Sequence, residues 1–154
     1  MKNFLRGFKH AAAGILYTMR TQRNMRIHIT TAAMVWLFAY VYGINEAQQV
    51  LLLCATAFVI ITEKVNTAIE KAVDTATQEY HPAAKAAKDA GAGAVLNAAI
   101  FAVIAAAMIF LDAEKLTAAF GAILQDWRYI AAFAGIFLGG LVWVVFGGKD
   151  IDGE

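Results

Sequence analysis

The chain has 154 residues, a length that favours a single domain. Its residues are 60% hydrophobic and only 16% charged, against about 45–50% and about 25% in soluble domains. A domain of this size has too much surface to hide so much apolar material, so the composition excludes a soluble enzyme and a disordered chain. The single cysteine excludes a disulfide scaffold, and a formal net charge of +1 gives no reason to expect a nucleic-acid partner. The composition therefore predicts a membrane protein.

The first segment, residues 1–27, is predicted to form an amphipathic helix that lies in the membrane interface without crossing it. Its apolar residues recur at helical spacing, and basic residues alternate with them, as in other helices that lie on membrane surfaces. The apolar positions are Phe4, Leu5, Phe8, Ala11, Ala12, Ile15 and Leu16, and the residues between them include Lys2, Arg6, Lys9 and His10. A simpler interpretation is a basic anchor that has no further role.

Four apolar runs follow, at residues 29–44, 47–62, 90–111 and 130–148. A bilayer core of about 30 Å needs about 20 helical residues, so the first run must tilt or draw on flanking residues to span it. No alternation of the outer-membrane barrel type occurs, so helices are the expected spanning form. Cys54, in the second run, is expected to be a small core residue. Residues 114–127 are predicted to form a short helix on the outer surface.

The basic residues predict the orientation of these spans. Eleven of the thirteen lie before the first run, between the second and third, or after the fourth. They are Lys2, Arg6, Lys9, Arg20, Arg23, Arg26, Lys64, Lys71, Lys85, Lys88 and Lys149. Only Lys115 and Arg128 fall on the other side, so both termini and the middle connection are expected on the cytoplasmic side.

A stripe of polar residues follows the second run. Glu63, Asn66, Glu70 and Asp74 lie at positions i, i+3, i+7 and i+11, which places them on one face of a helix. One interpretation is the solvated end of a helix that has left the bilayer. However, an ionisable residue at the membrane boundary is a functional candidate by default, and three acids with one amide form a more ordered pattern than solvation requires.

The next segment supplies the complementary charge. A turn at Glu79–Pro82 holds the only proline of the chain, and Lys85 and Lys88 follow on one face of the next helix. Asp89 either takes part in a site or simply pairs with Lys88. The glycines of Gly91–Ala94 permit close approach between helices. They do not form a phosphate-binding loop, since no GxxxxGK[ST] motif occurs in the sequence.

Together these residues are the parts that phosphoryl transfer requires. Carboxylates can hold a hard divalent cation such as Mg²⁺, lysines can bind phosphate groups, and a remaining Glu can accept a hydroxyl proton. Zinc fits poorly because the acids lack an accompanying Cys/His set. The position at the membrane boundary suggests that the hydroxyl belongs to a lipid. A small ion transporter is a weaker alternative, because the third and fourth runs hold no charge that would continue a path.

Three sequence segments resemble the prokaryotic diacylglycerol kinase and undecaprenol kinase family. They are EKVNTAIEKAVD (63–74), EYH (79–81) and AKDAGAGAVL (87–96). A fourth, RNMRIH (23–28), resembles the undecaprenol kinase branch. The resemblance implies an ATP- and Mg²⁺-dependent kinase of the bacterial cytoplasmic membrane that works as a homotrimer with shared active sites. Its substrate would be a lipid alcohol, with undecaprenol preferred and diacylglycerol second.

The expected fold is an all-α integral membrane protein. On the resemblance, residues 1–112 form the lipid-kinase core, with the surface helix at 1–27 and further helices at 28–44, 47–75 and 85–112. Residues 113–154 add the outer-surface helix, a fourth transmembrane helix and a short cytoplasmic tail.

The resemblance also implies roles for individual residues. Glu63 matches the general base that deprotonates the lipid hydroxyl, Asn66 an amide that orients the site, and Glu70 a carboxylate that binds Mg²⁺. Ala92 matches a small residue beside the substrate, and the N-terminal helix matches one that borders the lipid cleft. The positions that match nucleotide or metal contacts are His10, Gln22, Glu70, Glu79, Tyr80, His81, Lys88 and Asp89.

Two features depart from the family pattern. The family usually has a second metal-binding Glu directly before the RNMRIH string, where this chain has Gln22. An amide oxygen can coordinate a cation, but the site loses a negative charge. Weaker Mg²⁺ binding and a degenerate member that binds nucleotide without turnover therefore both stay open. The fourth run lies beyond the three-span family core and has no assigned chemistry, although Gly135, Gly139 and Gly140 make it a candidate contact surface.

Overall fold

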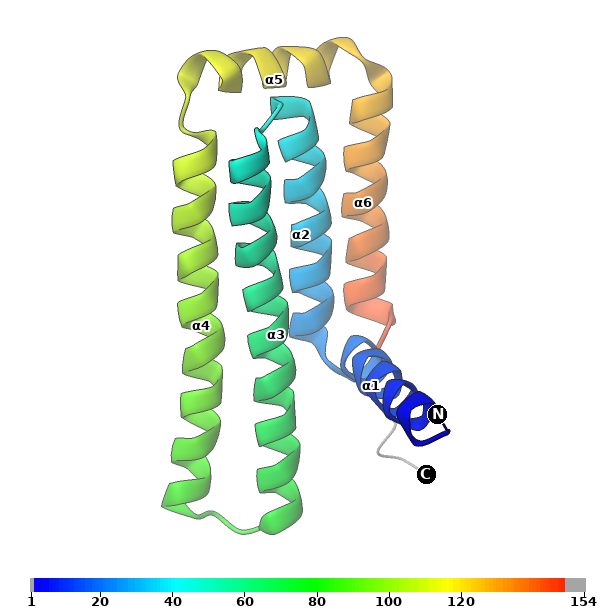
Figure 1. The fold of residues 1–154 in the computed structure, drawn as a ribbon, viewed down its shortest axis with the longest axis vertical. Coiled ribbons are helices and arrows are strands. Elements are labelled where there is room, and N and C mark those ends of the chain that lie inside the picture. The colour runs from blue at the N-terminus through cyan, green and yellow to red at the C-terminus, as the bar shows by residue number, and fades with distance from the viewer. Residues whose placement is uncertain (1, 149–154) are drawn as a thin grey trace.

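The computed structural model describes residues 2–148, and every regular element in that part of the chain is an α-helix. The helices are α1 (Lys2–Thr21), α2 (Arg23–Tyr42), α3 (Glu46–Ala76), α4 (Pro82–Phe110), α5 (Ala113–Gln125) and α6 (Trp127–Phe146). Figure 1 shows α2, α3, α4 and α6 side by side along the long axis, with α5 across one end. At the other end, α1 lies at an angle beside α2 and α6, and the α3–α4 hairpin extends beyond them. The predicted all-α class is confirmed, and the tail from Lys149 onward lies outside the described residues.

Local sequence signals mark where helices end and begin at the turns of the chain. Gly43, with φ 73°, is in the left-handed region and closes α2. Asn45 and Gln48 form a reciprocal capping box at the start of α3. Pro82 lies in the first turn of α4, where its missing N–H has no helical partner to lose. These caps keep the connections short, so consecutive long helices run antiparallel.

Three of the described helices, α3, α4 and α6, are long and apolar enough to cross a membrane. The sequence predicts four spans, and α2, the expected first span, is not one of these three. Its first two turns carry Arg23, Arg26 and His28, which lower its mean hydropathy. In Figure 1, α2 nevertheless runs alongside α3 and α6 for its whole length.

Two details of the sequence prediction are wrong. The surface helix expected at 1–27 ends at Thr21, because Gln22 has an extended backbone (φ −95°, ψ 116°) and Arg23–His28 form the start of α2. Cys54 is exposed rather than part of the core. A lipid-facing surface is as apolar as a protein interior, so an apolar run by itself does not tell the two environments apart.

The contact between α2 and α6 depends on one glycine. A Cβ atom built at Gly140 would lie 2.2 Å from Thr30 Cγ2, so the absence of a side chain permits this close approach. Gly135 and Gly139 have open space around them. Of the three glycines that made the fourth run a candidate contact surface, only Gly140 lies at this contact, and its partner is α2 of the same chain.

A buried arginine lies at the end of the same interface. The Arg26 side chain donates from Nη1 to the Arg20 carbonyl at 3.0 Å and from Nη2 to the Val144 carbonyl at 3.4 Å. The residue is only 4% exposed. One guanidinium group thus ties the last turn of α1, the first turn of α2 and the last turn of α6 together.

Aromatic side chains close the bundle at the end that α5 covers. The Phe38 ring lies 5.1 Å from the ring of Phe110 and 5.8 Å from that of Phe120, measured between centroids. Tyr42 contacts Phe110 edge to face, at 5.1 Å. The buried cluster beside these rings consists of Ala39, Leu52 and Ile109. The helices α2, α4 and α5 are therefore held together at this end.

A side chain at Gly140 is expected to destabilise the protein. Gly140→Val places methyl groups against Thr30, and overpacking of this kind lowers the free energy of unfolding by about 1–3 kcal/mol. Gly139→Val is the matched control, since nothing lies within 4 Å of a Cβ there. Thermal unfolding of both variants in detergent micelles measures the difference, and equal midpoints would contradict the described α2–α6 contact.

Candidate functional site

A buried carboxylate lies in the middle of the α3–α4 hairpin. Glu63 is 2% exposed, and its Oε2 atom has no hydrogen-bond partner among the described residues. The imidazole of His28 on α2 lies beside it, with Nε2 at 3.9 Å from Glu63 Oε2. That separation is too long for a direct hydrogen bond. Burying an ionisable group without a partner is energetically costly, so this position requires a functional explanation.

The next turn of α3 carries an amide that holds a second carboxylate. Asn66 Nδ2 donates to Glu70 Oε1 at 3.0 Å, which fixes the Glu70 side chain along the helix. Asn66 Oδ1 is buried without a partner and faces α4 at Gly91. A Cβ atom at Gly91 would lie 2.5 Å from Asn66 Oδ1, so the glycine is what lets α4 approach this amide.

A charged cleft of about 350 Å³ lies at the turn between α3 and α4. Its charged and aromatic lining residues are Asp74, Glu79, Tyr80, His81, Lys85, Lys88 and Asp89. Most of these side chains are exposed, and Tyr80 is 81% exposed. The predicted turn residues and lysines are thus brought to one place at the end of the hairpin.

The ion pairs of this cleft differ from the pairing that the sequence suggested. Asp89 pairs with Lys85, one helical turn before it on α4, and not with its neighbour Lys88. Lys88 reaches across to Asp74 of α3. Residues i and i+4 share a helix face whereas neighbours in sequence do not, which is why Asp89 selects Lys85. The Lys88–Asp74 pair therefore connects the two helices at the cleft.

Glu63, Asn66, Glu70 and Asp74 form a ladder along α3 that leads from the bundle to the cleft. Eleven residues separate the first from the last, or about 16 Å along the axis at a rise of about 1.5 Å per residue. Exposure rises along the ladder, since Glu63 and Asn66 are buried, Glu70 is half-buried and Asp74 is exposed. The predicted polar face is thus one continuous surface that joins an apolar environment to a charged one.

Three predicted site residues lie outside the charged cleft. His10 is on an exposed face of α1, Gln22 is half-buried at the break between α1 and α2, and Ala92 is exposed on α4. None of them lines the cleft. Ala92 directly follows Gly91 on α4, and Gly91 contacts Asn66 of the ladder.

The donor atoms suit Mg²⁺ by type. Among the described residues, no three His, Cys, Asp or Glu side chains are grouped to hold a metal ion. The predicted ligands Glu70 and Gln22 supply carboxylate and amide oxygens, and Mg²⁺ typically takes one or two protein carboxylates and completes its shell with substrate phosphates and water. Glu70, whose orientation Asn66 fixes, fits the role of that carboxylate.

The sequence analysis missed two residues that define this site. The sequence analysis considered His28 only as the last residue of the RNMRIH motif, and Gly91 only as one of the small residues of Gly91–Ala94. Contacts across helices decide both roles, and helical spacing gives no information on such contacts. For His28, the one available signal was an ionisable side chain at the start of an apolar run.

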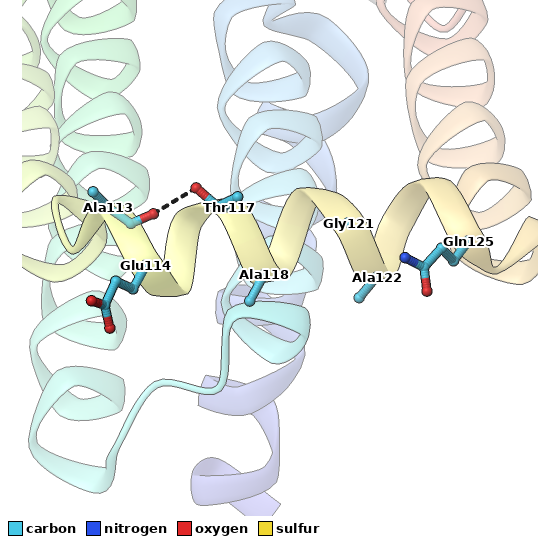
Figure 2. Close-up of a pocket in the computed structure, with 7 residues that line it drawn as sticks. All are labelled: Ala113, Glu114, Thr117, Ala118, Gly121, Ala122 and Gln125. Atoms are coloured by element: carbon cyan, nitrogen blue, oxygen red, sulfur yellow. Dashed lines mark hydrogen bonds between the residues drawn. The ribbon is translucent and has the colours of Figure 1, made fainter.

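Another depression lies along α5, at the opposite end of the molecule from the α3–α4 turn (Figure 1). Figure 2 shows that its lining residues all come from α5 itself: Ala113, Glu114, Thr117, Ala118, Gly121, Ala122 and Gln125. The Thr117 hydroxyl donates within the helix, to the Ala113 carbonyl at 2.8 Å. With one ionisable group and a single helix to form it, this depression lacks the groups that catalysis requires.

Similarity to known proteins agrees with the chemistry of the ladder and cleft. Residues 9–110 match the family described as prokaryotic diacylglycerol kinase. A diacylglycerol kinase of Synechocystis sp. is 44% identical over 110 residues, which cover 71% of this chain and 63% of that protein. An undecaprenol kinase of Bacillus subtilis is 37% identical over 111 residues, 72% of this chain and 90% of that protein. A diacylglycerol kinase of Escherichia coli is 36% identical over 83 residues, 54% of this chain and 64% of that protein.

The chain therefore belongs to the prokaryotic diacylglycerol kinase family, a class of integral-membrane lipid kinases that use ATP. It spans less than two thirds of the Synechocystis and Escherichia coli relatives and nine tenths of the Bacillus one. No solved structure matches the chain. The helices α5 and α6 lie outside the matched residues, whereas every residue of the ladder and the cleft lies within them.

A side chain at Gly91 is expected to impair phosphate transfer. In Gly91→Ala, the new methyl group displaces Asn66 and with it Glu70, and a misplacement of about 1 Å can lower a rate about a hundredfold. Gly93→Ala is the control, because nothing lies within 4 Å of a Cβ there. Initial rates of lipid phosphorylation measure the effect, with thermal midpoints as a check on folding. A Gly91→Ala rate equal to that of Gly93→Ala would show that the Asn66–Gly91 contact has no part in the reaction.

Proposed function

We propose that this protein transfers the γ-phosphate of ATP to the hydroxyl of a membrane lipid at the cytoplasmic face of the bilayer. The observation that carries the proposal is the buried, unpartnered Glu63 carboxylate at the membrane end of a polar ladder that leads to the charged cleft. A lipid hydroxyl approaches from the apolar side, and the nucleotide from the charged side. The two substrates meet along one face of α3.

The placement in the membrane follows from the helix arrangement and the basic residues. With α3, α4 and α6 as spans, α2 crosses as a fourth because it packs between α3 and α6 (Figure 1). The amphipathic α1 then lies in the cytoplasmic interface beside the α3–α4 hairpin, and α5 lies on the outer surface. This orientation puts the termini and the cleft in the cytoplasm, in agreement with the positive-inside rule, and suits the cytoplasmic membrane of a bacterium.

Glu63 acts as the general base in the proposed reaction. Its carboxylate takes the proton of the lipid hydroxyl as the hydroxyl oxygen forms a bond to the γ-phosphorus. The bond between the γ-phosphorus and the oxygen that bridges it to the β-phosphate breaks, and ADP leaves. Asn66 holds Glu70 beside the reacting groups through the hydrogen bond at 3.0 Å, and Ala92 borders the substrate.

The nucleotide lies along the ladder with its base toward the cleft. Lys88 supplies a positive charge for the phosphates, and the turn residues Glu79, Tyr80 and His81, with Asp89, line the end where the nucleoside would bind. Mg²⁺, held by Glu70 and through Gln22 by an amide oxygen, would neutralise charge on the transferring phosphate. His10 of α1 reaches the nucleotide only from a different position or a neighbouring chain, consistent with the homotrimer and shared sites that the resemblance implies.

Undecaprenol is the preferred substrate and diacylglycerol the second. The preference rests on the RNMRIH string at 23–28, which resembles the undecaprenol kinase branch. The relatives carry both names. A second candidate function is a degenerate family member that binds nucleotide without turnover. Gln22 is the observation that favours it, since the usual Glu would add a negative charge to the metal site.

Replacement of Glu63 by its amide is expected to abolish turnover. Glu63→Gln keeps the shape but removes the base, and loss of general-base catalysis lowers kcat by about a hundredfold or more. ATP binding should persist, because Glu63 lies away from the cleft. The control is Glu46→Gln, at an exposed carboxylate in the first turn of the same helix. Transfer of labelled phosphate to lipid in mixed micelles measures kcat, and a wild-type rate in Glu63→Gln would remove Glu63 as the base.

Removal of the Lys88 ammonium is expected to weaken ATP binding. A charge-assisted contact to phosphate contributes about 1.5–3 kcal/mol, so Lys88→Ala should raise the KM for ATP about tenfold or more. Asp74→Asn separates this role from that of the interhelix ion pair, because it removes the pair and leaves the lysine for phosphate. Its KM for ATP should stay near or below that of the wild type. Equal increases in both variants would mean that Lys88 acts only through Asp74.

A further inference from the structure

A groove of about 360 Å³ follows the contact between α2 and α6. Its lining residues include Ile27, Thr30, Thr31 and Met34 of α2 with Phe137 and Leu141 of α6. On α2 the walls extend about 10 Å, at a rise of about 1.5 Å per residue. One side of the groove belongs to α6, which lies outside the residues that match the kinase family. The groove is therefore a feature that the family-matched part of the chain does not form alone.

Two threonines in the wall of the groove have hydroxyl groups without a partner. In the apolar part of α3, the hydroxyls of Thr56 and Thr62 donate to the carbonyls four residues before them, both at 2.9 Å. Thr30 and Thr31 make no such bond, and their hydroxyls have no hydrogen-bond partner among the described residues. No water is present in the bilayer core to satisfy such groups. An occupant that supplies acceptor atoms would satisfy both hydroxyls.

A basic residue lies at the cytoplasmic end of the same helix face. Counted from Arg23, the α2 lining residues Ile27, Thr30, Thr31 and Met34 follow at i+4, i+7, i+8 and i+11, so all five share one face. Arg23 is exposed and pairs with no acidic group in the part of the chain that the structure describes. Neither α1, α2 nor α6 contains an acidic residue. The cytoplasmic end of the groove therefore attracts an anion.

We propose that the α2–α6 groove binds one acyl chain of an anionic phospholipid of the cytoplasmic leaflet, with the lipid phosphate at Arg23. The guanidinium attracts the phosphodiester, the threonine hydroxyls donate to ester oxygens, and the apolar walls cover a stretch of the chain. A zwitterionic phospholipid carries its own ammonium group, which weakens the attraction to Arg23, so the anionic class is favoured.

This lipid is a bound component of the protein and not its substrate. None of the residues of the ladder or the charged cleft lines the groove. The site goes beyond the proposed kinase function and uses only the membrane placement proposed with it. Its effect is on the packing of α6 against α2, since a lipid that binds the folded protein stabilises it.

The first experiment measures lipid binding by native mass spectrometry. The full-length protein in detergent micelles is titrated with phosphatidylglycerol, phosphatidylethanolamine or phosphatidylcholine, and phosphatidylglycerol should give the lowest Kd. Arg23→Gln should raise that Kd about fivefold, the effect of one basic residue near anionic lipid. Arg6→Gln is the control, because it removes a charge from an exposed position of α1. Equal Kd values for the three lipids, or equal effects of the two variants, would overturn the proposal.

The second experiment obstructs the groove. Leu141→Trp enlarges a side chain of the wall, and each methylene group of the lipid that loses its burial raises the Kd about fourfold. Leu138→Trp makes the same change at a similarly exposed position of α6 outside the groove. Phosphatidylglycerol should raise the thermal midpoint of the wild type and of Leu138→Trp, but not that of Leu141→Trp. Equal stabilisation of the two variants would overturn the groove as the site.

The third experiment locates the chain directly. Phosphatidylglycerol with a diazirine on one acyl chain is photolysed with the full-length protein in micelles, and the adducts are mapped by mass spectrometry. Adducts should concentrate at Met34 and Leu141 and decrease when unlabelled phosphatidylglycerol is added. Equal labelling around Met108, on an exposed face of α4, would overturn the proposal.

Two other occupants of the groove predict different results, and either would overturn the lipid site. If a second copy of the chain fills the groove, Leu141→Trp lowers the number of subunits and leaves phosphatidylglycerol binding unchanged. The acidic residues Asp150, Asp152 and Glu154 lie outside the described residues. If they neutralise Arg23, Arg23→Gln lowers the thermal midpoint without any lipid and leaves the Kd for phosphatidylglycerol unchanged.

None of these measurements depends on phosphate transfer. If lipid alcohols are phosphorylated but phosphatidylglycerol does not bind as described, the kinase function stands and the groove assignment is wrong. If phosphatidylglycerol binds in the groove but no lipid alcohol is phosphorylated, the proposed function fails and the lipid site stands.

Discussion

The structure depends on the burial of one carboxylate, that of Glu63, at the boundary between the membrane and the cytoplasm. An ionisable group in that position is costly unless a bound partner completes it, and the protein leaves its Oε2 atom without a hydrogen bond. The surrounding features follow from that constraint. The helix α3 continues beyond the bilayer as a polar ladder, α4 approaches that ladder closely at Gly91, and α2 brings His28 to 3.9 Å from the carboxylate. The buried group thus lies between the apolar part of α3 and the charged cleft at the α3–α4 turn.

The position of α2 depends in turn on α1 and α6. The extended backbone at Gln22 separates α1 from α2, and the Arg26 guanidinium holds that break to the last turn of α6 through two carbonyl groups. Gly140 lets α6 pack directly on Thr30. The helix beyond the family-matched residues therefore supports the same helix that carries His28. It contributes packing, and no part of the ladder or cleft.

Much of this architecture could be predicted from the sequence. Hydrophobic runs and helix-breaking residues located α3, α4, α5 and α6 closely, because these patterns depend on neighbours along the chain. The polar face from Glu63 to Asp74 and the turn at Glu79–Pro82 were also evident. The break at Gln22 was missed, since no proline or glycine marks it. Cys54 was misplaced because apolar residues face lipid as readily as protein.

The details of the site could not be predicted, because they arise between helices. Adjacency in the sequence suggested Asp89 as a partner for Lys88, but the structure pairs Asp89 with Lys85 and Lys88 with Asp74. Two further contacts likewise join residues that are far apart in the chain: His28 lies beside Glu63, and Asn66 contacts Gly91. Motifs identified which residue types matter, and the packing of α2 and α4 on α3 determined what each one touches.

The most direct test of this account is phosphate transfer by the purified wild-type protein in mixed micelles. ATP with Mg²⁺ is supplied together with undecaprenol or with diacylglycerol, and each lipid is analysed for added phosphate. The account predicts phosphorylation of a lipid hydroxyl, faster with undecaprenol than with diacylglycerol. Protein that binds ATP but transfers phosphate to neither lipid would contradict it, and would make the non-catalytic alternative that Gln22 suggests the better description.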